Sequence, residues 1–249
     1  MLSSAQSVED SLFEWYLNEL SLESSPSADL TSFINSLTLP FAVYFTVMFP
    51  IYASYRTQQT AKQLDREDEL PIFTITEGLK STINQFAARE ATSHMNTLKK
   101  DLEQALEIIK AKATTTAEMK ELFEQAYAQI RARRSETIAN TASVKIFNLS
   151  QYEADLQFLT RVGMVKQAYK VLFNLADDPC SICSFLIAES NRSPIPFTDA
   201  FVSLGQTIHT DERNMVFDYE DIIAGNVHPN CRCAYRLVIK DVSETSSGV

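Results

Sequence analysis

Residues that interrupt regular structure are scarce in this chain, which has five glycines and eight prolines among 249 residues. That scarcity argues against a disordered chain and against a turn-rich all-β fold. Positive charge is missing from residues 1–55, which contain acidic side chains but no lysine or arginine. With a formal net charge of −10, the chain lacks the phosphate-neutralising charge that nonspecific DNA binding needs. We therefore expect any contact with DNA to be weak.

Cysteine is also scarce, and all four cysteines lie in two short clusters near the C-terminus. Cys180 and Cys183 form a CxxC pair, and Cys231 and Cys233 follow His228 in the string His-Pro-Asn-Cys-Arg-Cys. Each short pair can place two ligands on one turn, and two such pairs have the spacing of structural zinc sites. Clustered thiols indicate a metal in a reducing compartment more than a disulfide framework. The alternative is that the thiols are simply buried, or form an adventitious disulfide.

Five candidate donors compete for the four positions of a tetrahedral zinc ion. Cys180, Cys183 and Cys231 supply three of them. The fourth is His228, whose HxxC spacing resembles a knuckle, or Cys233, which a strand would place on the same face as Cys231. We favour His228. A site closed by four protein ligands leaves no position for water, so the zinc should be structural.

Two carboxylates beside the CxxC pair raise the alternative of catalysis. Asp177 or Asp178 could act as the general base of a zinc-dependent hydrolase or nuclease if the zinc kept an open position. The simpler interpretation is a polar turn at the end of a strand. The sequence contains neither a Gly-rich phosphate loop nor a nucleophile motif, so we expect that the protein is not an enzyme.

The second unusual feature is an uncharged stretch from Leu30 to Tyr55. Its densest apolar part, Phe41 to Tyr52, is shorter than the about 20 residues that a membrane span needs. We therefore expect a core or partner-contact segment more than a membrane-interacting one. The side chains expected to lie against a partner, or else in the chain's own core, are Phe41, Tyr44, Phe45, Met48 and Phe49.

Hydrophobic periodicity predicts an α+β fold in which a mainly helical N-terminal two-thirds precedes a small β-containing module. Residues 1–70 should form N-terminal helices that include the uncharged segment, and residues 71–164 a helical bundle. From residue 165, Tyr169, Val171 and Phe173 alternate with Lys170 and Asn174, as in a strand. Residues 165–242 are thus predicted to be a metal-binding module with short antiparallel strands. Residues 243–249 should be a disordered tail.

Local signals predict where several helices begin and end. Ser27 or Asp29 should cap a short helix that runs to about Leu37. Thr115-Thr-Ala-Glu118 matches a capping box, Ser135 should cap a further helix, and Gly163 is a natural helix end. His94 and the cluster of Arg131, Arg133 and Arg134 are expected on solvated faces, where the arginines could also contact an acidic partner or DNA.

The same cysteine motifs resemble the phage head morphogenesis family, the minor head proteins similar to protein F of phage Mu. The resemblance is carried by Asp177-Asp-Pro-Cys-Ser-Ile-Cys183 after a strand-like run, and by His228-Pro-Asn-Cys-Arg-Cys233 before a last one. It covers residues 115–240. Asn140-Thr-Ala142 stands where the family usually has Arg-Thr-Glu.

The resemblance implies a structural role in procapsid assembly. It implies association with portal, capsid or scaffold proteins, and a place in the head interior or portal region after assembly in the host cytoplasm. Some members of the family leave the head with the DNA at ejection. The metal would then stabilise the C-terminal module, while the helices and the uncharged segment make the assembly contacts.

Overall fold

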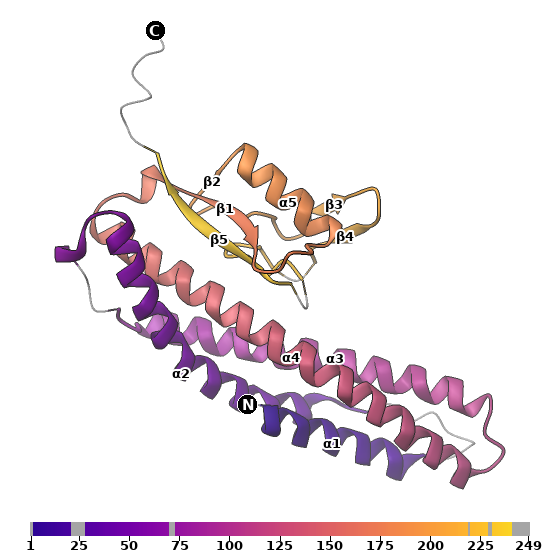
Figure 1. The fold of residues 1–249 in the computed structure, drawn as a ribbon. Helices are drawn as coiled ribbons and strands as arrows, with labels where there is room; N and C mark the ends of the chain where they lie inside the picture. The colour runs from indigo at the N-terminus through magenta and orange to yellow at the C-terminus, as the bar shows by residue number, and fades with distance from the viewer. Residues whose placement is uncertain (1, 21–27, 70–72, 219, 229–230, 241–249) are drawn as a thin grey trace. The chain divides into compact units, whose positions relative to one another are not determined.

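The computed structural model describes residues 2–20, 28–69, 73–218, 220–228 and 231–240 (Figure 1). Within them, the helices α1 (Leu2–Glu19), α2 (Thr31–Gln63), α3 (Glu77–Lys110) and α4 (Thr116–Arg161) come first, with a short 3-10 helix η1 (Glu67–Glu69) after α2. The C-terminal part holds η2 (Val165–Gln167), β1 (Ala168–Asn174), α5 (Ser181–Arg192), β2 (Ile195–Pro196), β3 (Thr207–His209), β4 (Asn214–Val216) and β5 (Cys233–Ile239). This order confirms the predicted α+β class. The predicted tail, 243–249, lies outside the described residues.

Contacts divide the chain into two compact units. Unit 1 comprises Met1–Val47 and Ile75–Ala142, and unit 2 comprises Met48–Thr74 and Ser143–Val249. The long helices α2 and α4 each contribute residues to both units. The division therefore falls inside these two helices.

The uncharged segment forms one continuous helix, α2, although the sequence predicted a short helix ending near Leu37. Each proline inside a helix costs about 3 kcal/mol, whereas burial of one large apolar side chain contributes about 1.5–3 kcal/mol. Four large side chains of α2 are buried at a spacing of four residues, enough to offset Pro40 and Pro50. They are Leu37, Phe41, Phe45 and Phe49.

This burial places three of the five side chains in the chain's own core, which was one of the two expected positions. Phe41, Phe45 and Phe49 are at most 2% exposed, so these side chains are not available to a partner. Tyr44 and Met48 are half-buried. The exposed apolar side chains of α2 form a different row, which we call the α2 ridge: Leu39, Val43, Val47, Ile51 and Tyr55. Both rows recur every fourth residue, so periodicity alone could not tell the buried row from the exposed one.

Several helix ends follow the predicted local chemistry. The Asp29 carboxylate accepts a hydrogen bond from the Thr31 N–H at 3.0 Å, where α2 begins. At the start of α4, the Thr115 hydroxyl accepts from the Glu118 N–H at 3.1 Å, and the Glu118 carboxylate accepts from the Thr114 N–H at 2.8 Å. Gly163, with a φ of 71°, follows the end of α4. The predicted helix start at Ser135 is wrong, because α4 runs unbroken through it.

Unit 1 contains a buried ion-pair network that the sequence did not indicate. Glu9 of α1 is fully buried, with Oε1 2.8 Å from His94 Nε2 and 3.0 Å from Arg134 Nε. Burial opposes ionisation of Glu9, but these two partners outweigh it and lower its pKa. His94 and Arg134 are therefore packed, and not solvated as predicted. Arg131 pairs with Asp10 at 3.3 Å.

Unit 2 is built on a three-stranded antiparallel sheet in the order β2-β1-β5. β1 and β5 pair along their whole length, with Ala168 opposite Ile239 and Asn174 opposite Cys233. α5 packs against β1, since the Ser190 hydroxyl accepts from the Leu172 N–H at 3.0 Å (Figure 1). The strand β1 and the last strand, β5, were predicted. The helix α5 and the β3–β4 hairpin were not.

A buried carboxylate joins the helices of unit 2 to its sheet. Asp155 of α4 is fully buried and accepts hydrogen bonds from Arg56 Nε and Nη2 at 2.8–3.0 Å. It also accepts from the Tyr235 hydroxyl of β5 at 2.7 Å and from the Thr60 hydroxyl. The charge is thus paired and satisfied from α2 and β5 together. Removing one partner of such a buried pair typically costs about 3–5 kcal/mol.

A lysine of β1, Lys170, is buried in the core of unit 2. Its side chain is fully buried on the same face of β1 as Ala168 and Leu172, and its Nζ donates to the Ile223 carbonyl at 2.6 Å. Nζ also lies 5.0–5.6 Å from the ring centroids of three aromatic side chains, Tyr152, Phe197 and Phe201. Burial lowers the pKa of Lys170 to about 7, although the charge of Asp199 opposes the shift.

This environment makes the stability of unit 2 depend on pH. The pKa of Lys170 is about 7 when folded and about 10.5 when unfolded, so between these values the unfolded chain binds the extra proton. The free energy of unfolding of the wild type, minus that of Lys170→Met, should therefore increase as the pH rises from 7 to 9.5. The increase should be at most about 1.4 kcal/mol per pH unit. Urea unfolding of both proteins at pH 7 and 9.5 measures this, with the exposed Lys240→Met as control. A Lys170→Met difference that stays constant with pH would contradict the assignment.

Candidate metal centre

The first cysteine pair lies at the start of α5. Cys180 is the residue before the helix, in an extended conformation, and Cys183 lies in the first turn. The first helical hydrogen bond runs from the Ser184 N–H to the Cys180 carbonyl at 2.8 Å. A helix N-terminus favours negative charge, so this position suits two thiolates.

The second cluster is held by a hydrogen bond and by the end of the sheet. The Cys231 N–H donates to the His228 carbonyl at 2.9 Å, which brings these two residues together. Cys233 begins β5, and the Leu175 N–H donates to the Arg232 carbonyl at 2.9 Å, so the β1–β5 ladder extends to the second cluster. Because β1 leads into Cys180 and β5 starts at Cys233, the pairing of the two strands brings both clusters to one end of the sheet.

Three residues that the sequence did not indicate lie around the backbone carbonyl of Cys233. The Asn148 amide and the Asn226 N–H both donate to the Cys233 carbonyl, at 2.8 and 3.1 Å. Gly225 has a φ of 97°, and a Cβ there would lie 2.8 Å from the same carbonyl oxygen, so only glycine fits. The Gly-Asn pair is a turn signal that could have been found in the sequence. Asn148 gave no such signal.

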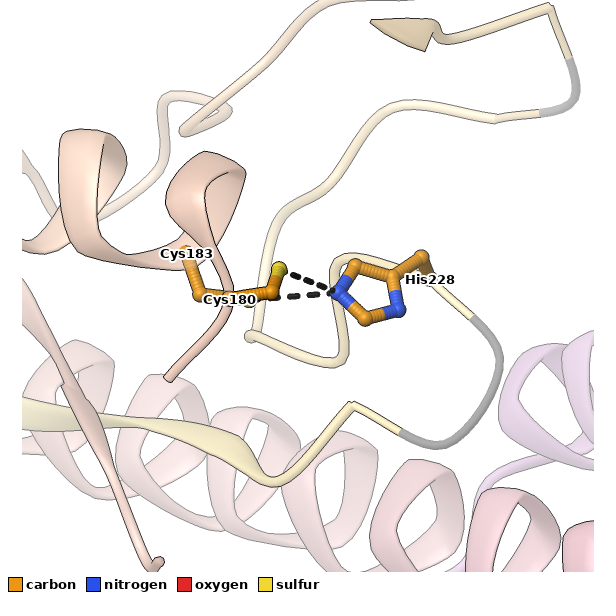
Figure 2. A group of neighbouring side chains, drawn as sticks. All are labelled: Cys180, Cys183 and His228. Carbon is orange, nitrogen blue, oxygen red and sulfur yellow. Dashed lines mark hydrogen bonds between the residues drawn. The ribbon is translucent and has the colours of Figure 1, made fainter. Parts of the chain in front are cut away.

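The donor atoms of all five predicted ligands converge. Figure 2 shows the His228 ring directed at the first pair, with Nε2 3.1 Å from Cys180 Sγ and 3.3 Å from Cys183 Sγ. Cys183 Sγ is also 3.6 Å from Cys231 Sγ. The donors form two groups, Cys180/Cys183/His228 and Cys183/Cys231/Cys233, and within each group all donor atoms lie within 4.8 Å of one another. Cys183 belongs to both.

Within each group the distances are near those between neighbouring ligands of a tetrahedral ion. With metal–sulfur bonds of about 2.3 Å and metal–nitrogen bonds of about 2.0–2.1 Å, neighbouring ligand atoms would lie about 3.5–3.8 Å apart. Cys183, Cys231 and Cys233 are at most 3% exposed, so the site is shielded from water on one side. Thiolate and imidazole donors suit a transition metal and not calcium or magnesium.

Protonation of the thiols points to the same conclusion. Hydrogen bonds from Cys183 and Cys233 lower the pKa of Cys231, and the hydrogen bond to Cys231 raises the pKa of Cys183. Three sulfurs so close together cannot all be thiolates unless a cation lies among them. A metal ion would replace the shared protons, and metal binding would release them.

The sequence did not indicate that an arginine, Arg213, would donate a hydrogen bond to the cluster at Cys180. Burial opposes ionisation of Cys180, but hydrogen bonds from the Cys183 N–H and from His228 lower its pKa. Nη2 of Arg213, which directly precedes β4, donates to Cys180 Sγ at 2.6 Å. Its positive charge offsets part of the negative charge of the cysteine cluster.

The two carboxylates considered for catalysis lie apart from these donors. Asp177 and Asp178 are exposed, and neither belongs to a donor group among the described residues. The polar-turn interpretation fits this position. Five donors are enough in number to fill the four positions of a tetrahedral ion without a water ligand.

Cys183→Ser tests the centre, because Cys183 is shared by both donor groups. The wild type should contain about one equivalent of metal, and a chelator should lower its unfolding temperature. The variant should contain little metal and should not respond to the chelator. Elemental analysis and thermal unfolding measure this, with the neighbouring exposed Ser184→Ala as control. Equal metal content in the wild type and Cys183→Ser would contradict the assignment.

Comparison of the chain with protein-family models, with curated proteins and with solved structures finds no match. The function therefore has to be inferred from the chemistry of the donor cluster and from the surfaces of the helices.

Proposed function

We propose that the chain is a structural assembly protein whose C-terminal module is closed by a zinc ion. Three thiolates and one imidazole would hold the ion, from Cys180, Cys183, Cys231 and His228. The observation that carries the proposal is the 3.6 Å approach of Cys183 and Cys231, which are separated by 48 positions in the chain. Zinc suits a mixed thiolate and imidazole set, and four protein ligands leave no open position for catalysis.

The setting we propose is the head of a tailed bacteriophage, with the chain as a minor head protein. The support is the resemblance of the two cysteine motifs to the head morphogenesis family, together with the convergence of those same motifs. Association with the portal or with capsid and scaffold proteins, and release with the DNA at ejection, belong to this proposal. The acidic charge of the chain favours protein partners over DNA.

The α2 ridge is the surface we propose for assembly contacts. Its five side chains are 55–68% exposed. Exposed apolar side chains gathered in a row are costly to leave in water and commonly mark interaction sites. Val43, Val47 and Ile51 are β-branched, so their side chains lose little conformational freedom when a partner covers them.

A second candidate function is interaction with a membrane through α2. This helix is long and apolar enough to cross a bilayer, with a mean hydropathy of 1.5 over its best 18-residue window, of which 22% is buried. A core helix of a soluble protein passes the same test when it is mostly buried; the buried Phe41, Phe45 and Phe49 favour that interpretation, whereas the low burial of the whole window does not. The third alternative, a hydrolase or nuclease using Asp177 or Asp178, has no observation in its favour among the described residues.

Val47→Asp should separate these functions. A carboxylate in the middle of the α2 ridge should block co-purification with the portal and capsid proteins of the genome that encodes the chain, while thermal stability changes little. The control is the double variant Asp177→Asn with Asp178→Asn, which should assemble normally. If the double Asp177→Asn and Asp178→Asn variant loses function while Val47→Asp assembles normally, the enzyme hypothesis is favoured. Wild-type binding to neutral lipid vesicles, abolished by Val47→Asp, would favour the membrane.

A further inference from the structure

The metal centre has one donor more than a tetrahedral ion requires. The five donors are not equivalent, because they form an outer and an inner set. Cys180 and His228 are half-buried, whereas Cys183, Cys231 and Cys233 are at most 3% exposed. The fifth donor must therefore be either idle or exchangeable.

Cys233 is already placed for coordination. Its sulfur lies within 4.8 Å of the sulfurs of Cys183 and Cys231. Its backbone is fixed three times, by pairing with Asn174 and by the two hydrogen bonds that its carbonyl accepts from Asn148 and Asn226. Coordination by Cys233 would thus need no rearrangement of the strand, while Cys180 would have to approach the inner sulfurs of Cys231 and Cys233.

His228 is the donor that can leave with the least disturbance. It lies on the half-buried side of the cluster, and its imidazole approaches Cys180 and Cys183 but shares no donor group with the inner sulfurs of Cys231 and Cys233. Cys183, which belongs to both donor groups, would stay bound throughout.

We propose that Cys233 is a reserve ligand which replaces His228, so that the centre exists in two states. In the mixed state the ion is held by three thiolates and the imidazole, and in the all-thiolate state by the four cysteines. This inference rests on the proposed metal site. In the exchange, the metal–nitrogen bond of His228 breaks, a metal–sulfur bond to Cys233 forms, and the Cys233 proton passes to water. The metal keeps its oxidation state.

The exchange changes the charge of the centre. A divalent ion with three thiolates and a neutral imidazole carries a net charge of −1, and with four thiolates −2. Burial disfavours the second negative charge, which makes the mixed state the resting one. The guanidinium of Arg213, 2.6 Å from Cys180 Sγ, offsets part of the added charge and makes the all-thiolate state accessible. The all-thiolate state would favour softer metal ions than zinc.

The experiment is titration of the full, metal-free chain with Co²⁺, followed by visible absorption. Four proteins are compared: the wild type, His228→Ala, Cys233→Ser and the double variant. His228→Ala should still bind one Co²⁺, with its absorption moved to longer wavelength as a fourth thiolate replaces nitrogen. Cys233→Ser should bind one Co²⁺ with the wild-type spectrum. The loss of Co²⁺ affinity in the double variant should exceed the product of the losses in the two single variants, by more than about tenfold.

Two results would overturn the inference. If His228→Ala weakens binding as much as the double variant does, Cys233 does not replace the imidazole. If Cys233→Ser changes the wild-type spectrum, Cys233 is a resident ligand and not a reserve one. Failure of the wild type to bind Co²⁺ would instead overturn the proposed metal site. His209→Ala, which removes an exposed histidine outside the cluster, controls for nonspecific binding.

Discussion

Three buried sulfur atoms that lie close together impose the main physical constraint on unit 2. Without a cation they must share protons, because thiolates at this distance repel one another in a poorly hydrated site. With a divalent ion among them, the same atoms become ligands whose bond energy stabilises the fold. Cys183 is the centre of this constraint, since it approaches both His228 and Cys231.

The rest of unit 2 is arranged so that this convergence is possible. The ladder between β1 and β5 aligns the two cysteine clusters, and Asn148 of α4 holds the carbonyl of Cys233. Asp155 connects α4 with α2 and β5 through groups that are all buried or nearly so. Lys170 fills the core face of β1 with an amine that donates to the Ile223 carbonyl and lies over aromatic rings. The cysteine and histidine cluster is therefore one of several polar connections in this small core, and its soft donors could hold a metal ion.

Features that depend on neighbouring residues could be predicted from the sequence. The Thr115 capping box, the helix end at Gly163 and the close spacing within each cysteine cluster, Cys180 with Cys183 and His228 with Cys231, all involve short-range chemistry. Features that depend on distant partners could not. Glu9 meets Arg134 across 125 positions, so neither its burial nor that of His94 can be read from local pattern. Lys170 was grouped with the polar face of its strand, because its carbonyl partner Ile223 lies 53 positions away.

The central claim is that one zinc ion is held by three thiolates and one imidazole. X-ray absorption at the zinc edge of the purified wild-type chain tests it most directly, since it counts the ligand types and measures their bond lengths. The account predicts three sulfur ligands at about 2.3 Å and one nitrogen at about 2.0–2.1 Å, with His228 as the nitrogen ligand. A shell dominated by oxygen and nitrogen, or a protein purified without chelator that carries no metal, would contradict it.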